Sequence, residues 1–425
     1  APFIQASGTR WRIDNCTITA QDSSAGGGYG IYARGYSYGN CSSGLIDNNI
    51  FYNQRIYVDC TSSIQGQHDC FAYDEPLGTS NAVYIEDNTF TKTTFGNVID
   101  GQRGGRVVVR YNTLTDGQVM FHGRGANTYE RAIRYWEIYG NTWNGVSGNS
   151  EPPTQLRSGT GVLFNNTVNG AWGWSSNLLI TSDRSNGGYG ILCNGTSPID
   201  NNDLANGYIC RDQAGAGRDV ARTVATGNWV SGEGWVGTVA WQKQTSAPIY
   251  AWNNNKSVVV HGTTGATVWD HIVENRDFYD AYPNGAQTSK TSPFNGTTSM
   301  GYGTYANRPD TCTTGVGYWA TDRGGNWNTA NDDANDGALY KCTSTNVWTL
   351  FYVPYTYPHP LRSGEAPPED TQAPYISNTT ASQIACDAES PVNVTLSAST
   401  NENAYCRYST SDVAYLLKND WYYQK

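Results

Sequence analysis

Short segments that combine an apolar residue, a polar residue and glycine recur along the chain and carry its main candidates for chemistry. Residues 99–101 (Ile-Asp-Gly) and 121–123 (Phe-His-Gly) are two of them. If the chain folds as stacked repeats, equivalent positions form columns on one face, so we expect Asp100 to lie beside His122. A carboxylate beside an imidazole can take part in acid–base catalysis.

Further side chains near equivalent positions would complete a saccharide-binding groove. Arginine can neutralise the carboxylate of an acidic sugar during elimination, and paired acids can hydrolyse a glycosidic bond. The candidate catalytic residues are Asp100, His122, Arg124 and Arg157. The candidate carbohydrate-binding residues are Trp172, Trp174, Arg103, Asp183 and Arg184. The same residues could instead form a solvated column of side chains that satisfy one another, and both interpretations stay open.

These columns depend on a hexapeptide pattern of apolar, variable, turn-forming, Asn, Thr and apolar residues. Four regular copies begin at Ile85, Val109, Ile138 and Leu163, which are 24, 29 and 25 residues apart. A period in the twenties indicates stacked units, because one unit cannot bury its apolar face alone. Asn tolerates left-handed backbone, and its amide can bond the equivalent amide one repeat away. The pattern therefore predicts β-coils joined by an asparagine ladder.

Less regular copies extend the repeat from about residue 13 to residue 255, and the periodicity stops near Asp280. The first copy lacks a preceding cap, so we expect earlier repeats before residue 1. The predicted organisation is a solenoid over 1–280, a linker running back along it over 281–311, a disulfide-linked aromatic β module over 312–362, a linker over 363–374 and a partial β-sandwich over 375–425.

Composition excludes several classes of function. The net charge is −10, which argues against nucleic-acid partners, and no apolar run is long enough to span a membrane. Residues 331–337 resemble a calcium loop, but Ala334 stands where an oxygen ligand is expected and no bidentate Glu follows. We therefore expect an acidic turn and no cofactor, with calcium as the alternative. The motifs GxSxG, HExxH and GxxxxGK[ST] are absent.

Ten cysteines without a CxxC motif favour disulfides in an oxidising compartment, and hence an extracellular or cell-surface location. Their spacing suggests pairing between sequence neighbours. The predicted pairs are Cys16–Cys41, Cys60–Cys70, Cys193–Cys210, Cys312–Cys342 and Cys386–Cys406.

The repeated Asn-Thr hexapeptides between residues 13 and 255 resemble those of right-handed parallel β-helix proteins, the pectate-lyase-like superfamily. Residues 208–213, 249–253 and 318–360 resemble a group of secreted bacterial β-helix proteins, and residues 401–409 are similar to bacterial Ig-like repeats. The resemblance implies an all-β fold: a right-handed parallel β-helix followed by two small β modules, the second a partial Ig-like sandwich.

Function does not follow from this fold, since it hosts enzymes, adhesins and passive spacers. Tyr and Trp residues, including Trp172, Trp174 and those between Trp319 and Tyr357, favour contact with sugars or proteins. We predict a secreted matrix or surface protein with a structural, adhesive or glycan-contacting role. The alternative is a polysaccharide lyase or glycoside hydrolase. The expected partner is a polysaccharide or surface glycan, with self-association or another extracellular protein left open.

Overall fold

The computed structural model describes two compact units, residues 1–364 and 365–425. The described residues are 4–19, 29–35, 41–60, 71, 77–123, 131–146, 151–172, 175–181, 212–219, 228–230, 234–236, 244–260, 272–363, 376–381 and 396–400. In the second unit they form one antiparallel pair, β29 (Ile376–Ala381) and β30 (Leu396–Thr400). The rest of the sandwich predicted over 375–425 lies outside the described residues.

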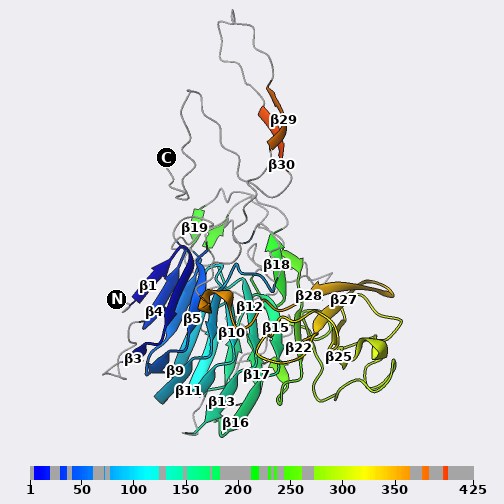
Figure 1. Cartoon of the computed structure of the whole chain (residues 1–425), viewed down its shortest axis with the longest axis horizontal. Coiled ribbons are helices and arrows are strands. Elements are labelled where there is room, and N and C mark those ends of the chain that lie inside the picture. The colour runs from blue at the N-terminus through cyan, green and yellow to red at the C-terminus, as the bar shows by residue number, and fades with distance from the viewer. Residues whose placement is uncertain are drawn as a thin grey trace, which may run out of the picture. The chain divides into compact units, whose positions relative to one another are not determined.

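The first unit is built on two large parallel sheets, and its described residues contain no α-helix. The first sheet has eight strands. In order they are β2 (Thr9–Asp14), β5 (Ser43–Asp47), β8 (Val83–Glu86), β10 (Arg106–Arg110), β12 (Tyr135–Tyr139), β15 (Thr160–Phe164), β22 (Ile249–Trp252) and β24 (Phe278–Asp280). Neighbouring strands come from successive repeats (Figure 1). For example, Val109 of β10 pairs with Ile85 of β8 on one side and with Ile138 of β12 on the other.

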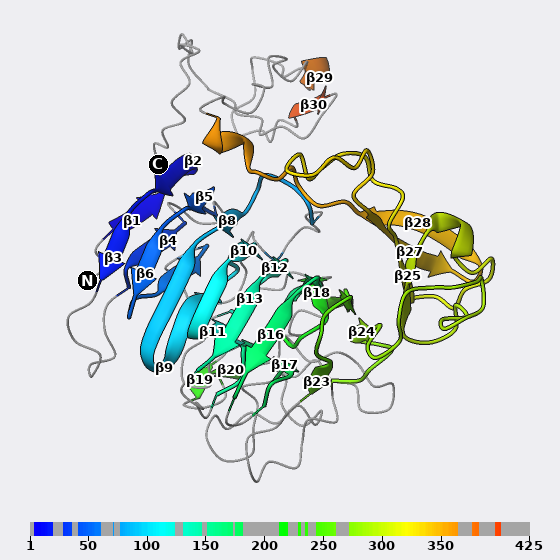
Figure 2. The ribbon, with the colours of Figure 1, turned by 60° about the horizontal axis from the view of Figure 1, so that its bottom comes forward.

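The second sheet has twelve strands and spans two faces of the repeats. Two of its strands are long, and their first and second halves pair with different neighbours. Its main path runs β1 (Ile4–Ser7), β4 (Ile31–Arg34), β7 (Ile56–Asp59), β9 (Thr89–Gln102), β11 (Thr113–Phe121), β14 (Thr154–Leu156), β17 (Leu178–Ile180) and β23 (Val258–Val260). The other strands are β3 (Thr17–Thr19), β6 (Ile50–Tyr52), β13 (Thr142–Gly145) and β16 (Thr167–Gly170), which pair with each other and with the first halves of β9 and β11 (Figure 2).

An asparagine ladder joins consecutive repeats at the bend between the two sheets. The predicted ladder is confirmed for Asn49, Asn88, Asn112, Asn141, Asn166 and Asn254. Each of the first five donates from its side-chain amide to the side-chain oxygen of the next at 3.0–3.2 Å. The left-handed residue of the bend is the one before the ladder Asn, such as Asn48, Tyr111 or Gly140. The ladder Asn itself supplies hydrogen bonds.

Apolar side chains fill the space between the sheets in columns. Phe51 stacks on Phe90 with ring centroids 4.6 Å apart, and Leu114, Trp143 and Val168 continue the column. All are buried. Burial of this kind supplies most of the stability of stacked repeats.

A four-stranded sheet covers the outward face of the eight-stranded sheet. It contains β25 (Met300–Gly303), β26 (Gly317–Ala320), β27 (Ala338–Ser344) and β28 (Val347–Tyr352), with the 3₁₀ turn η2 (Tyr305–Asn307) between the first two. Its Trp319 stacks on Trp252 at 4.7 Å, and Trp252 stacks on Phe164 at 4.4 Å. The aromatic module of 312–362 therefore shares a core with the repeats. Two short antiparallel pairs complete the unit: β18 (Ala216–Asp219) with β21 (Gln244–Ser246), and β19 (Asn228–Val230) with β20 (Gly234–Val236).

Residues 353–363, which include the 3₁₀ turn η3 (Pro360–Arg362), continue over the same face and are held by buried charges. Arg110 is bonded to Glu86 and donates to the carbonyls of Tyr355 and Thr356 at 2.8 and 2.9 Å. Arg362 in turn lies 2.7 Å from Glu86. Burying these charges is acceptable because each meets an opposite charge and hydrogen-bond partners.

The disulfides correct part of the predicted pairing. Cys312–Cys342 is confirmed, but Cys41 pairs with Cys60, so the pairs Cys16–Cys41 and Cys60–Cys70 were wrong. Cys16 has a free thiol because it occupies the ladder position of the first repeat: its N–H donates to Asn49 and its thiol to the carbonyl of Asp14. Cys70, Cys193, Cys210, Cys386 and Cys406 lie outside the described residues.

Replacing Asn112 by Ala is expected to destabilise the protein by about 3 kcal/mol, because it leaves the buried carbonyls of Ile85 and Arg110 and the N–H of Asn88 unpaired. Chemical denaturation measures the loss. Thr113→Ala, at the exposed next position, is the control and should change stability little. Equal losses for the two variants would contradict a structural role for the ladder.

Stability is also expected to fall as the pH drops from about 6.5 towards 3. Burial, with Arg110, Arg362 and Arg12 near by, lowers the pKa of His359 to about 3. In this pH range the unfolded chain binds a proton at this histidine that the folded chain does not bind. The free energy of unfolding therefore falls by up to about 1.4 kcal/mol per pH unit. His359→Asn keeps an acceptor for the N–H of Leu361 but does not titrate. In urea unfolding over this range, the free energy of unfolding should depend less on pH for the variant than for the wild-type protein. The same pH dependence in both proteins would contradict the role given to His359.

Candidate functional site

The C-terminal ends of β4, β7, β9, β11 and β14 present polar and aromatic side chains away from the core. Ile31, Ile56 and Ile99 pair in register and point inward, so the residues that follow them point outward. We call this surface the polar face. It consists of Tyr32, Arg34, Tyr57, Asp59, Asp100, Arg103, His122, Gln155 and Arg157, with Tyr29 and Arg55 beside them.

The predicted neighbours Asp100 and His122 are confirmed to lie in contact on this face. The two atoms Oδ1 of Asp100 and Nδ1 of His122 are 2.8 Å apart. Asp100 is buried, while the His122 side chain keeps 29% of its surface exposed. A carboxylate on Nδ1 holds the neutral imidazole with its proton there, which leaves Nε2 as the basic nitrogen. The pair can therefore accept a proton from a bound molecule.

Arg55 lies on the other side of Asp100, with Nη1 3.7 Å from Oδ2. Its guanidinium also lies over the ring of Tyr29, 4.4 Å from the centroid. Its Nε is buried and has no hydrogen-bond partner among the described residues. Arg55 therefore has donor capacity that the described protein does not use.

Asp59 forms a second buried carboxylate on the polar face. Its Oδ2 accepts from the hydroxyl of Tyr32 at 2.6 Å and from Arg103 at 3.1 Å. Its Oδ1 has no partner among the described residues. Burial raises the pKa of Asp59, and the contacts with Tyr32 and Arg103 oppose that rise. Arg103 therefore favours the charged form of this carboxylate, against the effect of burial.

Three tyrosines form an aromatic cluster next to these charges. The ring of Tyr29 lies 4.5 Å from that of Tyr57 and 5.6 Å from that of Tyr32. Tyr29 and Tyr32 remain partly exposed. Aromatic faces flanked by hydrogen-bonding groups are the usual means by which proteins contact sugar rings.

The other predicted site residues are only partly placed on this face. Arg157 belongs to it, since its N–H donates to the carbonyl of Phe121, next to His122, and its guanidinium bonds Gln155. Trp172 does not: it follows β16, is buried, and bonds the carbonyl of Asn169. Arg124, Trp174, Asp183 and Arg184 lie outside the described residues.

The aromatic residues predicted to be available to partners are largely buried. Tyr318, Trp319, Trp327 and Tyr352 are at most 7% exposed. They form the core between the four-stranded and eight-stranded sheets, so their abundance reflects packing of one sheet on another.

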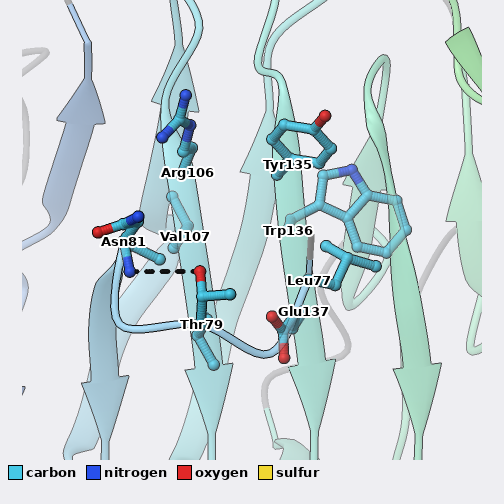
Figure 3. Close-up of a pocket in the computed structure, with 10 residues that line it drawn as sticks. Leu77, Thr79, Asn81, Arg106, Val107, Tyr135, Trp136 and Glu137 are labelled. Carbon is cyan, nitrogen blue, oxygen red and sulfur yellow. Dashed lines mark hydrogen bonds between the residues drawn. The ribbon is translucent and has the colours of Figure 1, made fainter. Parts of the chain in front are cut away.

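One pocket lies on the eight-stranded sheet, under residues 77–82, and Figure 3 shows its lining. Its volume is about 20 Å³, which is room for a single water molecule. Glu137 beneath it accepts from the N–H of Gly78 and the hydroxyl of Tyr352. This pocket is too small for a sugar.

Within the described part of the chain, no three His, Cys, Asp or Glu side chains are grouped to hold a metal ion. In the acidic loop, Asp336 accepts from Asn331 and from the N–H of Asn328. No helix among the described residues has the length and apolar character to cross a membrane.

Sequence reasoning missed Arg55, Asp59 and the three tyrosines. A signal was present: residues 31–34 (Ile-Tyr-Ala-Arg) and 56–59 (Ile-Tyr-Val-Asp) match residues 99–102 (Ile-Asp-Gly-Gln) position for position. Aligning these segments would have placed Tyr32, Tyr57 and Asp100 in one column.

Comparison with models of protein families, with curated proteins and with solved structures finds no match for this chain. The repeats, the ladder and the parallel sheets are compatible with a β-helix.

Replacing Arg103 by Met is expected to lower the free energy of unfolding by about 2 kcal/mol at pH 7 and by clearly less at pH 4. Without Arg103 the pKa of Asp59 rises further, so folding loses stability as the pH rises through that pKa, whereas at low pH the protonated carboxyl needs no cation. Urea unfolding at the two pH values measures this. Arg323→Met, whose contact with Asp322 is long and exposed, is the control. A loss of stability that is the same at both pH values would contradict the ion pair between Arg103 and Asp59.

Proposed function

We propose that residues 4–280 form a right-handed parallel β-helix of a secreted matrix or cell-surface protein, and that its polar face contacts an acidic glycan. The carrying observation is the group formed by Arg55, Tyr29, Asp100 and His122. The disulfides Cys41–Cys60 and Cys312–Cys342 favour an oxidising environment, which is consistent with a location outside the cell.

An acidic sugar suits this group better than a neutral one. The Arg55 side chain keeps 28% of its surface exposed and makes only a long contact to Asp100. A carboxylate on the sugar would accept from the exposed part of the guanidinium, while the neighbouring ring of Tyr29 would contact an apolar face of the sugar. A neutral sugar would contact the ring of Tyr29 but would offer no carboxylate to the guanidinium of Arg55.

Binding is tested by titrating the protein with a polyuronate and with the same polymer after its carboxyl groups are reduced to alcohols. We expect the acidic polymer to bind at least about tenfold more tightly, equivalent to about 1.4 kcal/mol. Arg55→Gln should remove that preference, because the amide carries no charge. Arg323→Gln, an exposed arginine in the loop between β26 and β27, is the matched control. Equal affinity for both polymers would defeat the proposal.

Elimination is the second candidate function, favoured by the 2.8 Å contact between Asp100 and His122. With Nδ1 protonated, Nε2 of His122 would take the proton next to the sugar carboxylate. The electron pair forms a carbon–carbon double bond as the adjacent glycosidic C–O bond breaks, and the departing oxygen takes a proton from solvent water. Arg55 would neutralise the carboxylate during this step.

Turnover is measured by the absorbance of the unsaturated product. We expect His122→Gln to abolish any turnover while polymer binding persists, because the base is lost and Arg55 remains. Binding without product in the wild-type protein would reject elimination and leave the glycan-contacting role.

A further inference from the structure

A third face of the repeats, distinct from the polar face, carries a regular array of threonines. It is formed by β3, β6, the first halves of β9 and β11, β13 and β16, which Figure 2 shows in this order. Each strand contributes two outward positions, and these pair in register from strand to strand. The six pairs are Thr17 and Thr19, Ile50 and Tyr52, Thr89 and Thr91, Thr113 and Thr115, Thr142 and Asn144, and Thr167 and Asn169. We call these twelve residues the threonine face.

The hydroxyls of this face are available to solvent. Eight of the twelve residues are Thr, all partly or fully exposed, and none of the twelve is charged. None of the eight hydroxyls has a hydrogen-bond partner in the part of the chain that the structure describes. Threonines elsewhere do have one, as Thr160 does with the carbonyl of Pro248. Water must therefore bond to the hydroxyls of the threonine face.

The array is also held rigidly. The residue between each outward pair points into the core, as Phe90, Leu114 and Trp143 do, and all three are fully buried. A ladder Asn stands just before every strand of this face except β3, where Cys16 takes its place, as Asn88 and Asn112 do before β9 and β11. β-branched Thr is itself restricted to few side-chain rotamers. Both the backbone and the hydroxyls therefore keep fixed positions.

The geometry is a two-dimensional grid. Neighbouring strands are about 4.8 Å apart, and alternate residues along a strand are about 6.6 Å apart. The run from β9 to β16 carries six Thr and two Asn without an apolar interruption, whereas Ile50 and Tyr52 separate it from β3. A single polymer chain repeats in one dimension, and a charged ligand would need charges that this face lacks. A crystal surface repeats in two dimensions and can be uncharged.

We propose that the threonine face binds ice. Its grid of hydroxyls would hold water in a fixed two-dimensional pattern that joins the ice lattice, while the Thr methyl groups fill the spaces between those waters. Charged side chains would orient water around themselves and disturb that order, and this face has none. The inference is independent of the polar face, since the two surfaces share no residue.

The test measures thermal hysteresis, the gap between melting and freezing of a seeded ice crystal, with the full chain. We expect a gap and faceted crystals for the wild-type protein. Thr113→Tyr, which places a bulky ring in the centre of the grid, should abolish both, and Thr89→Tyr is the second variant. Thr343→Tyr, at an exposed strand position of the four-stranded sheet, should retain both. Arg55→Gln should also retain them.

Circular dichroism and thermal unfolding establish that each variant is folded before it is compared. If one tyrosine variant fails to fold, the other supplies the comparison. Absence of hysteresis and of crystal faceting in the wild-type protein would overturn the proposal. It would also be overturned if a folded Thr113→Tyr or Thr89→Tyr variant kept full activity.

Discussion

The asparagine ladder is the interaction on which the rest of the structure depends. At each bend the backbone turns through a left-handed residue, so its polar groups cannot all pair within a sheet. The ladder Asn supplies the missing partners: Asn141, for example, bonds the carbonyls of Val109 and Tyr139 and the amide of Asn166. It therefore sets both the angle of the bend and the alignment of one repeat with the next. Every outward column depends on that alignment, because a shift of one residue would turn each side chain to the opposite side.

Given this alignment, the residue types in the columns of each face determine whether that face is covered by other segments or stays exposed to solvent. On the eight-stranded sheet, Tyr139, Phe164 and Trp252 stack outward at about 4.4 Å, and such a surface must be covered. The four-stranded sheet covers it. The polar and threonine faces have less apolar surface to bury, so they can stay in contact with solvent. The same backbone repeat thus yields one internal face and two surfaces with different chemistry.

The sequence predicted what is periodic and local. The hexapeptides located the ladder and the parallel strands, because one period fixes which residues align. The contact of Asp100 with His122 was also predicted, but from an alignment two residues off: the register pairs Asp100 with Met120 and Gly101 with Phe121. The sequence did not predict contacts between segments far apart in the chain. Nothing local marks Arg362 as the partner of Glu86, or Tyr352 as the partner of Glu137. The error at Cys16 has the same origin: pairing by sequence proximity ignores that residue 16 is a ladder position, where the thiol donates to the carbonyl of Asp14.

The use of arginine in this acidic chain separates structural cations from those open to a ligand. Arg110, Arg131 and Arg362 are each within 3.0 Å of a buried carboxylate, and their removal would leave that charge unpaired. Such arginines hold segments together and have little capacity left for a partner. Arg55 differs, since its closest carboxylate is 3.7 Å away and already bonded to His122. Because the net charge of −10 repels polyanions over most of the surface, an acidic glycan would be drawn to the few places where a cation is incompletely paired. Among the described residues, Arg55 on the polar face meets that condition.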